Sequence, residues 1–159
     1  MSSWGEAWEA TEWALTEWLA GTQGHTMGVE AWRAEDFPRA LPHGDDEAAI
    51  WCLSLGGGEV GVQRQERAEI PGGIWHVNGE IVVRGRRAPT VRRMAAELFG
   101  ALPAGPLDVA NVARLYPTAY PTLNRILIPA ADAALENELG FESRIGVRCA
   151  FCNPKENEE

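Results

Sequence analysis

The chain begins with apolar and acidic residues that repeat at helical spacing. Four apolar residues lie at intervals that place them on one face of a helix: Trp4, Trp8, Leu15 and Leu19. This pattern predicts an amphipathic helix over residues 4–20 that ends at Gly21. Trp13 lies off this stripe, so we expect it either to pack on a neighbouring subunit or to be the one exposed tryptophan of an ordinary core helix.

Three later segments have the pattern of strands. Residues 48–55 form a near-continuous apolar run, which is typical of a strand covered on both faces. Residues 74–84 and 141–151 alternate between apolar and polar positions, and this predicts half-buried strands. We expect the first two segments to pair antiparallel across a long loop over residues 56–73, which contains little that can pack in a core.

The remaining segments complete a plan of helices and strands. A second helix is expected over residues 89–102, which begins with a proline at a first-turn position. Further strands are expected over residues 27–32, 109–115 and 124–128, and the Ala-rich connection over 129–140 is long enough for a short helix. The expected fold class is therefore α+β, with a mostly antiparallel sheet of four to five strands and the helices packed on one face.

Charge limits the partners that suit this fold. The chain has 159 residues with 14 Lys and Arg against 23 Asp and Glu, which gives a net charge of −9. Such a chain is not expected to grip nucleic acid as its main task, because that affinity comes mainly from basic side chains on phosphates. The only charged residues among the first twenty are Glu6, Glu9, Glu12 and Glu17, whereas a later cluster without acids holds Arg84, Arg86, Arg87, Arg92 and Arg93. These groups fit either complementary faces of neighbouring subunits or solvated surfaces.

Length and hydropathy indicate a single domain. We expect one α+β domain over residues 1–152, followed by a frayed acidic tail over residues 153–159. The apolar stretches are far shorter than the ~20 residues of a membrane-spanning helix. The start of the sequence also lacks the basic and apolar regions of a signal peptide. A soluble protein of a reducing compartment is therefore expected.

The sequence contains no recognisable catalytic or cofactor motif. Cys149 and Cys152 form a C-x-x-C, but residues three apart on a strand point to opposite faces, so neither zinc nor redox chemistry is expected there. His76 is expected to be a surface residue of its strand, and the acidic run at residues 45–47 a solvated loop rather than a calcium site. No nucleophile lies in a pattern with a base, so we expect no enzyme activity, metal or cofactor.

The order of the elements resembles one protein family. It comprises a leading amphipathic helix, the segment Glu35-Asp36-Phe37-Pro38 before the first main strand, a long hairpin, a helix over the sheet and the alternating strand Gly140–Phe151. This layout, over residues 4–151, resembles the tail terminator (tail completion) proteins of long-tailed bacteriophages. The resemblance implies a virion protein that forms a hexameric ring on the head-proximal end of the tail tube. Such a ring stops tube polymerisation and joins the head connector, and DNA passes through its lumen without specific binding.

Ten residues are candidate contacts in such a ring. They are Trp13 in the first helix, Gln63, Arg64, Gln65 and Arg67 in the 56–73 loop, and the cluster of Arg84, Arg86, Arg87, Arg92 and Arg93. The arginine cluster is expected to face an acidic surface of a neighbour, such as the helix over residues 6–17.

The sequence leaves three alternatives open. The first is another neck or tail-tube component of the same particle, and unlimited polymerisation would distinguish a tube protein from a terminator. The second is a small hydrolase or metal-dependent enzyme that uses His76, Cys149 or the acidic loop. The third is a monomeric ligand-binding domain in which the tryptophans line a pocket.

Overall fold

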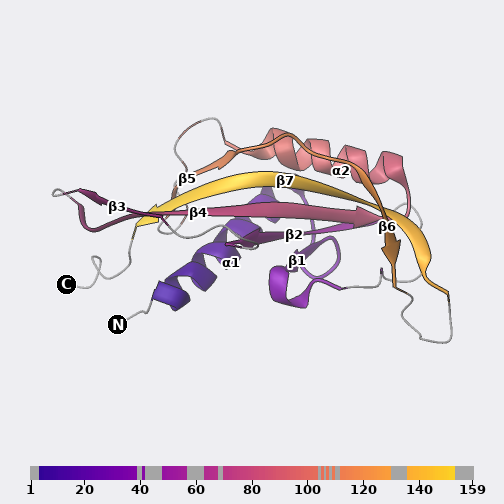
Figure 1. The fold of residues 1–159 in the computed structure, drawn as a ribbon, viewed down its shortest axis with the longest axis horizontal. Coiled ribbons are helices and arrows are strands. Elements are labelled where there is room, and N and C mark those ends of the chain that lie inside the picture. Colours follow the sequence, from indigo (N-terminus) through magenta and orange to yellow (C-terminus); the bar gives the residue numbers. More distant parts are fainter. Residues whose placement is uncertain are drawn as a thin grey trace.

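A sheet with two helices on one face forms the body of the protein (Figure 1). The computed structural model describes residues 4–38, 41, 48–56, 63–67, 70–103, 105, 107, 109, 112–129 and 136–152. In these ranges the helices are α1 (Trp4–Gln23) and α2 (Ala88–Ala101), with a short 3₁₀ helix over Ala34–Asp36. The strands are β1 (Ala31–Arg33), β2 (Ala49–Leu55), β3 (Gln63–Arg67), β4 (Ile70–Gly85), β5 (Val112–Pro117), β6 (Asn124–Ile128) and β7 (Glu138–Cys152).

Two long antiparallel strands, β4 and β7, form the centre of the sheet. Their register runs from the pair Ile74 and Cys152 to the pair Gly85 and Phe141. The outer edge of β4 pairs with both β2 and β3, and the outer edge of β7 pairs with both β5 and β6. Only β1 and β2 pair in parallel among the described strands. Each long strand therefore carries two short strands, one toward each of its ends.

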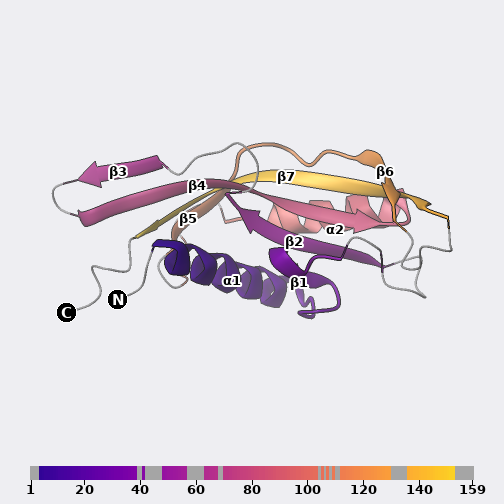
Figure 2. The same cartoon turned by 60° about the horizontal axis from the view of Figure 1, so that its bottom comes forward.

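The core lies between the sheet and the two helices. Over residues 49–55 of β2, 77–83 of β4 and 141–151 of β7 the odd-numbered residues face the helices, in agreement with the period of two that the alternating pattern predicted. The fully buried side chains of this core include Leu15 and Leu19 of α1, Trp51 and Leu53 of β2, Ile81 and Val83 of β4, Leu98 of α2, and Ile145 and Phe151 of β7. Figure 2 shows α1 along the β2 side of the sheet, and α2 packs over β4 and β7. The α+β class, the mostly antiparallel sheet and the placement of both helices on one face are thus confirmed.

The sheet has more strands than the expected four to five, since seven lie in the described ranges. One reason is that the expected loop over residues 56–73 is wrong. It contains β3 and the first residues of β4, which pair antiparallel from Gln63 opposite His76 to Arg67 opposite Ile70. Backbone hydrogen bonds hold such a ladder together, and they do not require the alternating apolar pattern by which strands are recognised in a sequence.

Several predicted boundaries also move. The first helix does not end at Gly21 but continues to Gln23, and Gly24 then takes the left-handed conformation (φ +69°) that ends it. There the His25 N–H donates to the Ala20 carbonyl at 2.8 Å. The strand expected over residues 27–32 is the short β1, and β5 begins at Val112 rather than 109. The acidic run 45–47, the tail 153–159 and residues 130–135 lie outside the described residues, and residues 138–140, where the connection could have held a short helix, belong to β7.

Neither described helix is long and apolar enough to cross a membrane.

Candidate interaction surfaces

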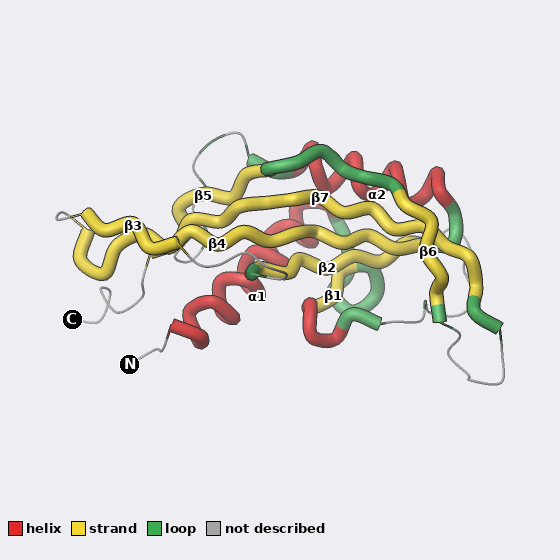
Figure 3. The backbone as a smooth tube through the Cα atoms, viewed as in Figure 1, coloured by secondary structure: helices red, strands yellow, loops and turns green. Residues whose placement is uncertain are grey.

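The first candidate surface is a two-stranded arm formed by β3 and the start of β4. The pairing of β4 with β7 starts at Ile74, so Ile70–Gly73 pair only with β3 among the described strands. Figure 3 shows this hairpin extending past the end of the paired β4 and β7. A two-stranded ribbon without further support is marginally stable in water. Residues 70–73 of the arm therefore receive no support from β7 in the described chain.

The arm carries four of the predicted contact residues. The backbone places Gln63, Arg64, Gln65 and Arg67 on β3, and the register shifts between Gln65 and Arg67. Because β3 pairs only with β4 among the described strands, its second edge offers backbone donors and acceptors to a partner.

Side chains of helix α1 form hydrogen bonds with the last residue of β2, Leu55, which precedes the arm in the chain. The strand β1 covers β2 only from Trp51 to Leu53, so the outer N–H and C=O of Leu55 need other partners. The Leu55 N–H donates to Glu12 Oε2 at 2.8 Å, and Trp8 Nε1 donates to the Leu55 carbonyl at 3.0 Å. Burial raises the pKa of Glu12, and the hydrogen bond from Leu55 partly offsets this rise. These two side chains therefore close the edge of the sheet beside the arm.

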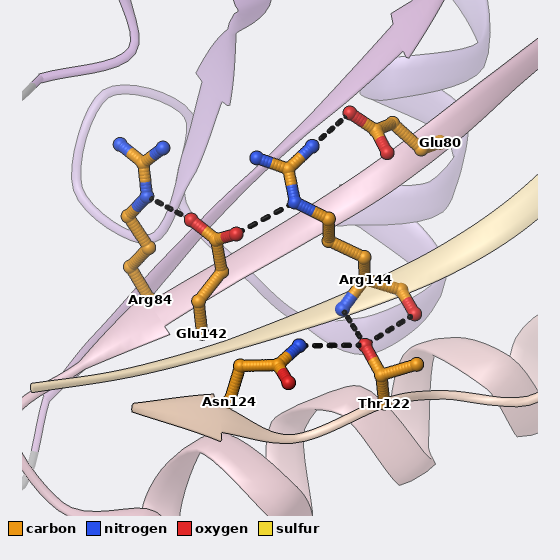
Figure 4. Close-up of polar contacts among 6 residues, drawn as sticks. All are labelled: Glu80, Arg84, Thr122, Asn124, Glu142 and Arg144. Atoms are coloured by element: carbon orange, nitrogen blue, oxygen red, sulfur yellow. Dashed lines mark hydrogen bonds and ion pairs between the residues drawn. The ribbon is translucent and has the colours of Figure 1, made fainter. Parts of the chain in front are cut away.

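The second candidate surface is the helix-free face of the sheet, where four charged side chains form a chain (Figure 4). Arg84 Nε lies 2.7 Å from Glu142 Oε2, and Arg144 Nε lies 2.6 Å from Glu142 Oε1. A further ion pair joins Arg144 to Glu80. Although burial opposes the charge of Glu142, the hydrogen bonds and charges of the two arginines outweigh this effect and lower its pKa. The Glu142 side chain is only 9% exposed, so these ion pairs are part of the structure of this face.

Both cysteines that the structure places in detail are buried. Cys52 lies on β2 and Cys149 on β7, and burial raises the pKa of each thiol to about 12. A thiol with such a pKa is protonated near neutral pH and is a poor nucleophile. Cys149 and Cys152 both lie within β7, as the alternating pattern predicted. No group of three or more His, Cys, Asp or Glu that could hold a metal lies within the described ranges.

The structure divides the predicted arginine cluster into two groups. Arg84 pairs with Glu142 and Arg86 Nε lies 2.7 Å from Glu138 Oε2, so these two arginines connect β4 and the residue after it to β7. The other members, Arg87, Arg92 and Arg93, lie exposed at the start of α2 and along its outer surface. Two of the five arginines thus have acidic partners within the chain, and the contact of the cluster with a neighbouring subunit stays a prediction. Glu142 and Glu138, the partners of Arg84 and Arg86, lie more than 50 residues away in sequence. The local order of charges therefore does not predict these ion pairs.

Trp13 lies between the two predicted states. It is half-buried, and the Arg33 guanidinium lies 4.3 Å from the centre of its ring. Arg33 also forms an ion pair of 3.1 Å with Glu35. Glu9 and Glu17 are exposed one turn before and one turn after Trp13, so the outer surface of α1 is acidic around a partly covered aromatic ring.

Two features were missed at the sequence level. One is the ion-pair chain of the helix-free face. In the sequence, Glu142 and Arg144 occupy the polar positions of the alternating last strand, which could have indicated it. The other is an apolar pair on the β6–β7 hairpin, where Leu127 and Leu139 are cross-strand partners that are 65% and 70% exposed.

Two shallow pockets, of about 250 and 260 Å³, lie beside Tyr120 and beside Arg84. Both are small for the burial of a metabolite-sized ligand.

Comparison of the chain with models of known protein families and with curated proteins finds no match.

Proposed function

We propose that this chain is a tail terminator of a long-tailed bacteriophage: a structural protein, with no catalytic role, that forms a ring on the head-proximal end of the tail tube. The ring stops further tube growth and presents the surface to which the head connector binds. In this proposal the protein acts in the virion and needs no cofactor. DNA passes through the lumen without specific binding.

The β3–β4 arm is the observation that carries the proposal. Its first residues on β4 have no β7 partner in the described chain, and a bare hairpin gains stability when it docks on another surface. A subunit that reaches the last ring of a tube with an arm, and offers no equivalent surface on its other side, ends a head-to-tail stack. The net charge of −9 further supports a lumen that repels passing DNA.

The test is capping of tail tubes by the purified protein. Tubes of the matching tube protein are incubated with this chain and imaged by electron microscopy, and their lengths are followed in time. We expect closed rings on one tube end and an arrest of growth. Unchanged tubes beside free protein would refute the proposal, and unlimited polymerisation of this chain by itself would assign it to the tube instead.

A trimmed variant tests the arm directly. Gln65 and Ile74 are already cross-strand partners, so residues 66–73 can be replaced by Asn-Gly, which suits a two-residue hairpin turn. The pairing of β4 with β7 starts at Ile74 and is retained, so the variant is expected to fold, as circular dichroism and urea unfolding would show. We expect it to lose tube capping, whereas Arg125→Gln, an exposed change on β6, retains it. Capping by the folded trimmed variant would show that the arm is not the docking element.

A further inference from the structure

The outer surface of α2 carries basic side chains that the fold does not use. The helix buries Thr90, Val91, Ala95 and Leu98 against the sheet, so Arg92 and Arg93 point to solvent. In the described part of the chain neither forms an ion pair. The two arginines are adjacent in sequence on the exposed surface of α2.

The outer surface of α1 carries the opposite charge. Glu9 and Glu17 are exposed and lie about 12 Å apart along the helix, at a rise of ~1.5 Å per residue. Half-buried Trp13 lies between them along the helix. Neither glutamate forms an ion pair with another described residue. This surface therefore offers two separated negative charges on either side of Trp13, whose ring is partly covered by Arg33, and Arg33 is itself paired with Glu35.

The two charged surfaces belong to different flanks of the helical layer. α1 packs on β1 and β2, whereas α2 packs mainly on β4 and β7 (Figure 2). No ion pair joins the two helices among the described residues, so both surfaces remain available to another molecule. We infer that the α2 surface of Arg92 and Arg93 docks on the α1 surface of Glu9, Trp13 and Glu17 of a second copy of this chain. This inference rests on the proposed function only in identifying that copy as the neighbour in the ring.

A contact between two different surfaces of the same protein repeats from copy to copy. Such a heterologous contact closes into a ring when the rotation between copies allows it. Exposed ion pairs contribute little stability each, so the charges mainly select the partner surface and its orientation. The structure also narrows the basic side of the contact to α2, because Arg84 and Arg86 are already paired with Glu142 and Glu138.

The test uses two variants with reversed charges. The first carries Arg92→Glu and Arg93→Glu, so both of its surfaces are acidic; the second carries Glu9→Lys and Glu17→Lys, so both are basic. We expect each alone to associate roughly tenfold or more weakly than the wild type in sedimentation measurements at low salt. An equimolar mixture places every acidic surface against a basic one and is expected to restore association. The matched control Arg125→Glu, an exposed reversal on β6, should associate as the wild type does.

Each outcome decides the inference. Recovery of association in the mixture supports the inference, because two charge-reversed variants can bind each other only if the α1 and α2 surfaces meet. Wild-type association of either variant, or a mixture no better than its components, overturns it and assigns the arginines to a partner other than a second copy. The solution assay needs no tail tube, so the α1–α2 contact can fail while capping succeeds, and capping can fail while the contact stands.

Discussion

Glu142 is the residue whose replacement best tests the ion-pair chain of the helix-free face. We consider Glu142→Gln, which keeps the volume of the side chain and removes its charge. In the structure the carboxylate accepts hydrogen bonds from Arg84 Nε at 2.7 Å and from Arg144 Nε at 2.6 Å. The glutamine amide group can accept only one of these bonds and turns its own N–H donors toward the other guanidinium.

The expected loss of stability follows from the burial of the three groups. Breaking a fully buried ion pair costs ~3–5 kcal/mol, and one hydrogen bond to a charged group is worth ~1.5–3 kcal/mol. The arginine side chains are 24% and 43% exposed, so water replaces part of what they lose. We therefore expect Glu142→Gln to reduce the free energy of unfolding by about 2 kcal/mol at pH 7, or about 1 M in the urea midpoint.

The dependence on pH separates this reason from a packing defect. The folded state holds the pKa of Glu142 below its ordinary value of 4.5. Its contribution is therefore fully present above about pH 4.5 and is lost as the pH falls through the lower pKa of the folded state. The difference between wild type and variant should be constant from neutral pH down to that point and shrink below it. A variant as stable as the wild type at pH 7, or a difference that persists unchanged in acid, would refute this reasoning. Glu97→Gln, on the exposed surface of α2, is the control and should change stability by less than ~0.5 kcal/mol.

Two further changes test the packing of the sheet. Gly79→Ala should destabilise the protein by more than ~2 kcal/mol in urea unfolding, because the new Cβ would lie 2.3 Å from a carbonyl oxygen of β2, whereas Gly100→Ala has open space on α2 and should stabilise it by ~0.5–1 kcal/mol. If the two variants change the free energy of unfolding equally, the close approach of β4 to β2 at Gly79 does not exclude a larger side chain there. His25→Ala removes the acceptor of the buried Trp51 Nε1, 2.8 Å from His25 Nδ1, and should cost ~1–3 kcal/mol with a shift in tryptophan fluorescence. His25→Asn, whose carbonyl oxygen takes about the position of Nδ1, should lose less, and an equal loss in both variants would argue against the hydrogen bond.

The sequence by itself determined the elements that bury an apolar stripe. The recurrence of Leu15 and Leu19 identified α1, and the alternation over residues 74–84 and 141–151 identified the two central strands. The period of the apolar residues shows which side of each helix or strand faces the core. The burial of these apolar side chains in one core is the main driving force of folding, so this pattern is strong in the sequence. The class of the fold and the placement of both helices on one face followed from those same periods.

Only the tertiary structure decided how distant segments meet. The polar β3 was not recognisable because its partner is the backbone of β4, and backbone hydrogen bonds leave no pattern in side-chain polarity. The arginines looked like one cluster until the register of β4 against β7 placed Glu142 opposite Arg84, 58 residues away in sequence. The sequence also did not show that Arg92 and Arg93 of α2 are exposed and, among the described residues, unpaired while Arg84 and Arg86 are paired. Which charges meet depends on strand register and on the rotation of the helix, and the local order of charges predicts neither.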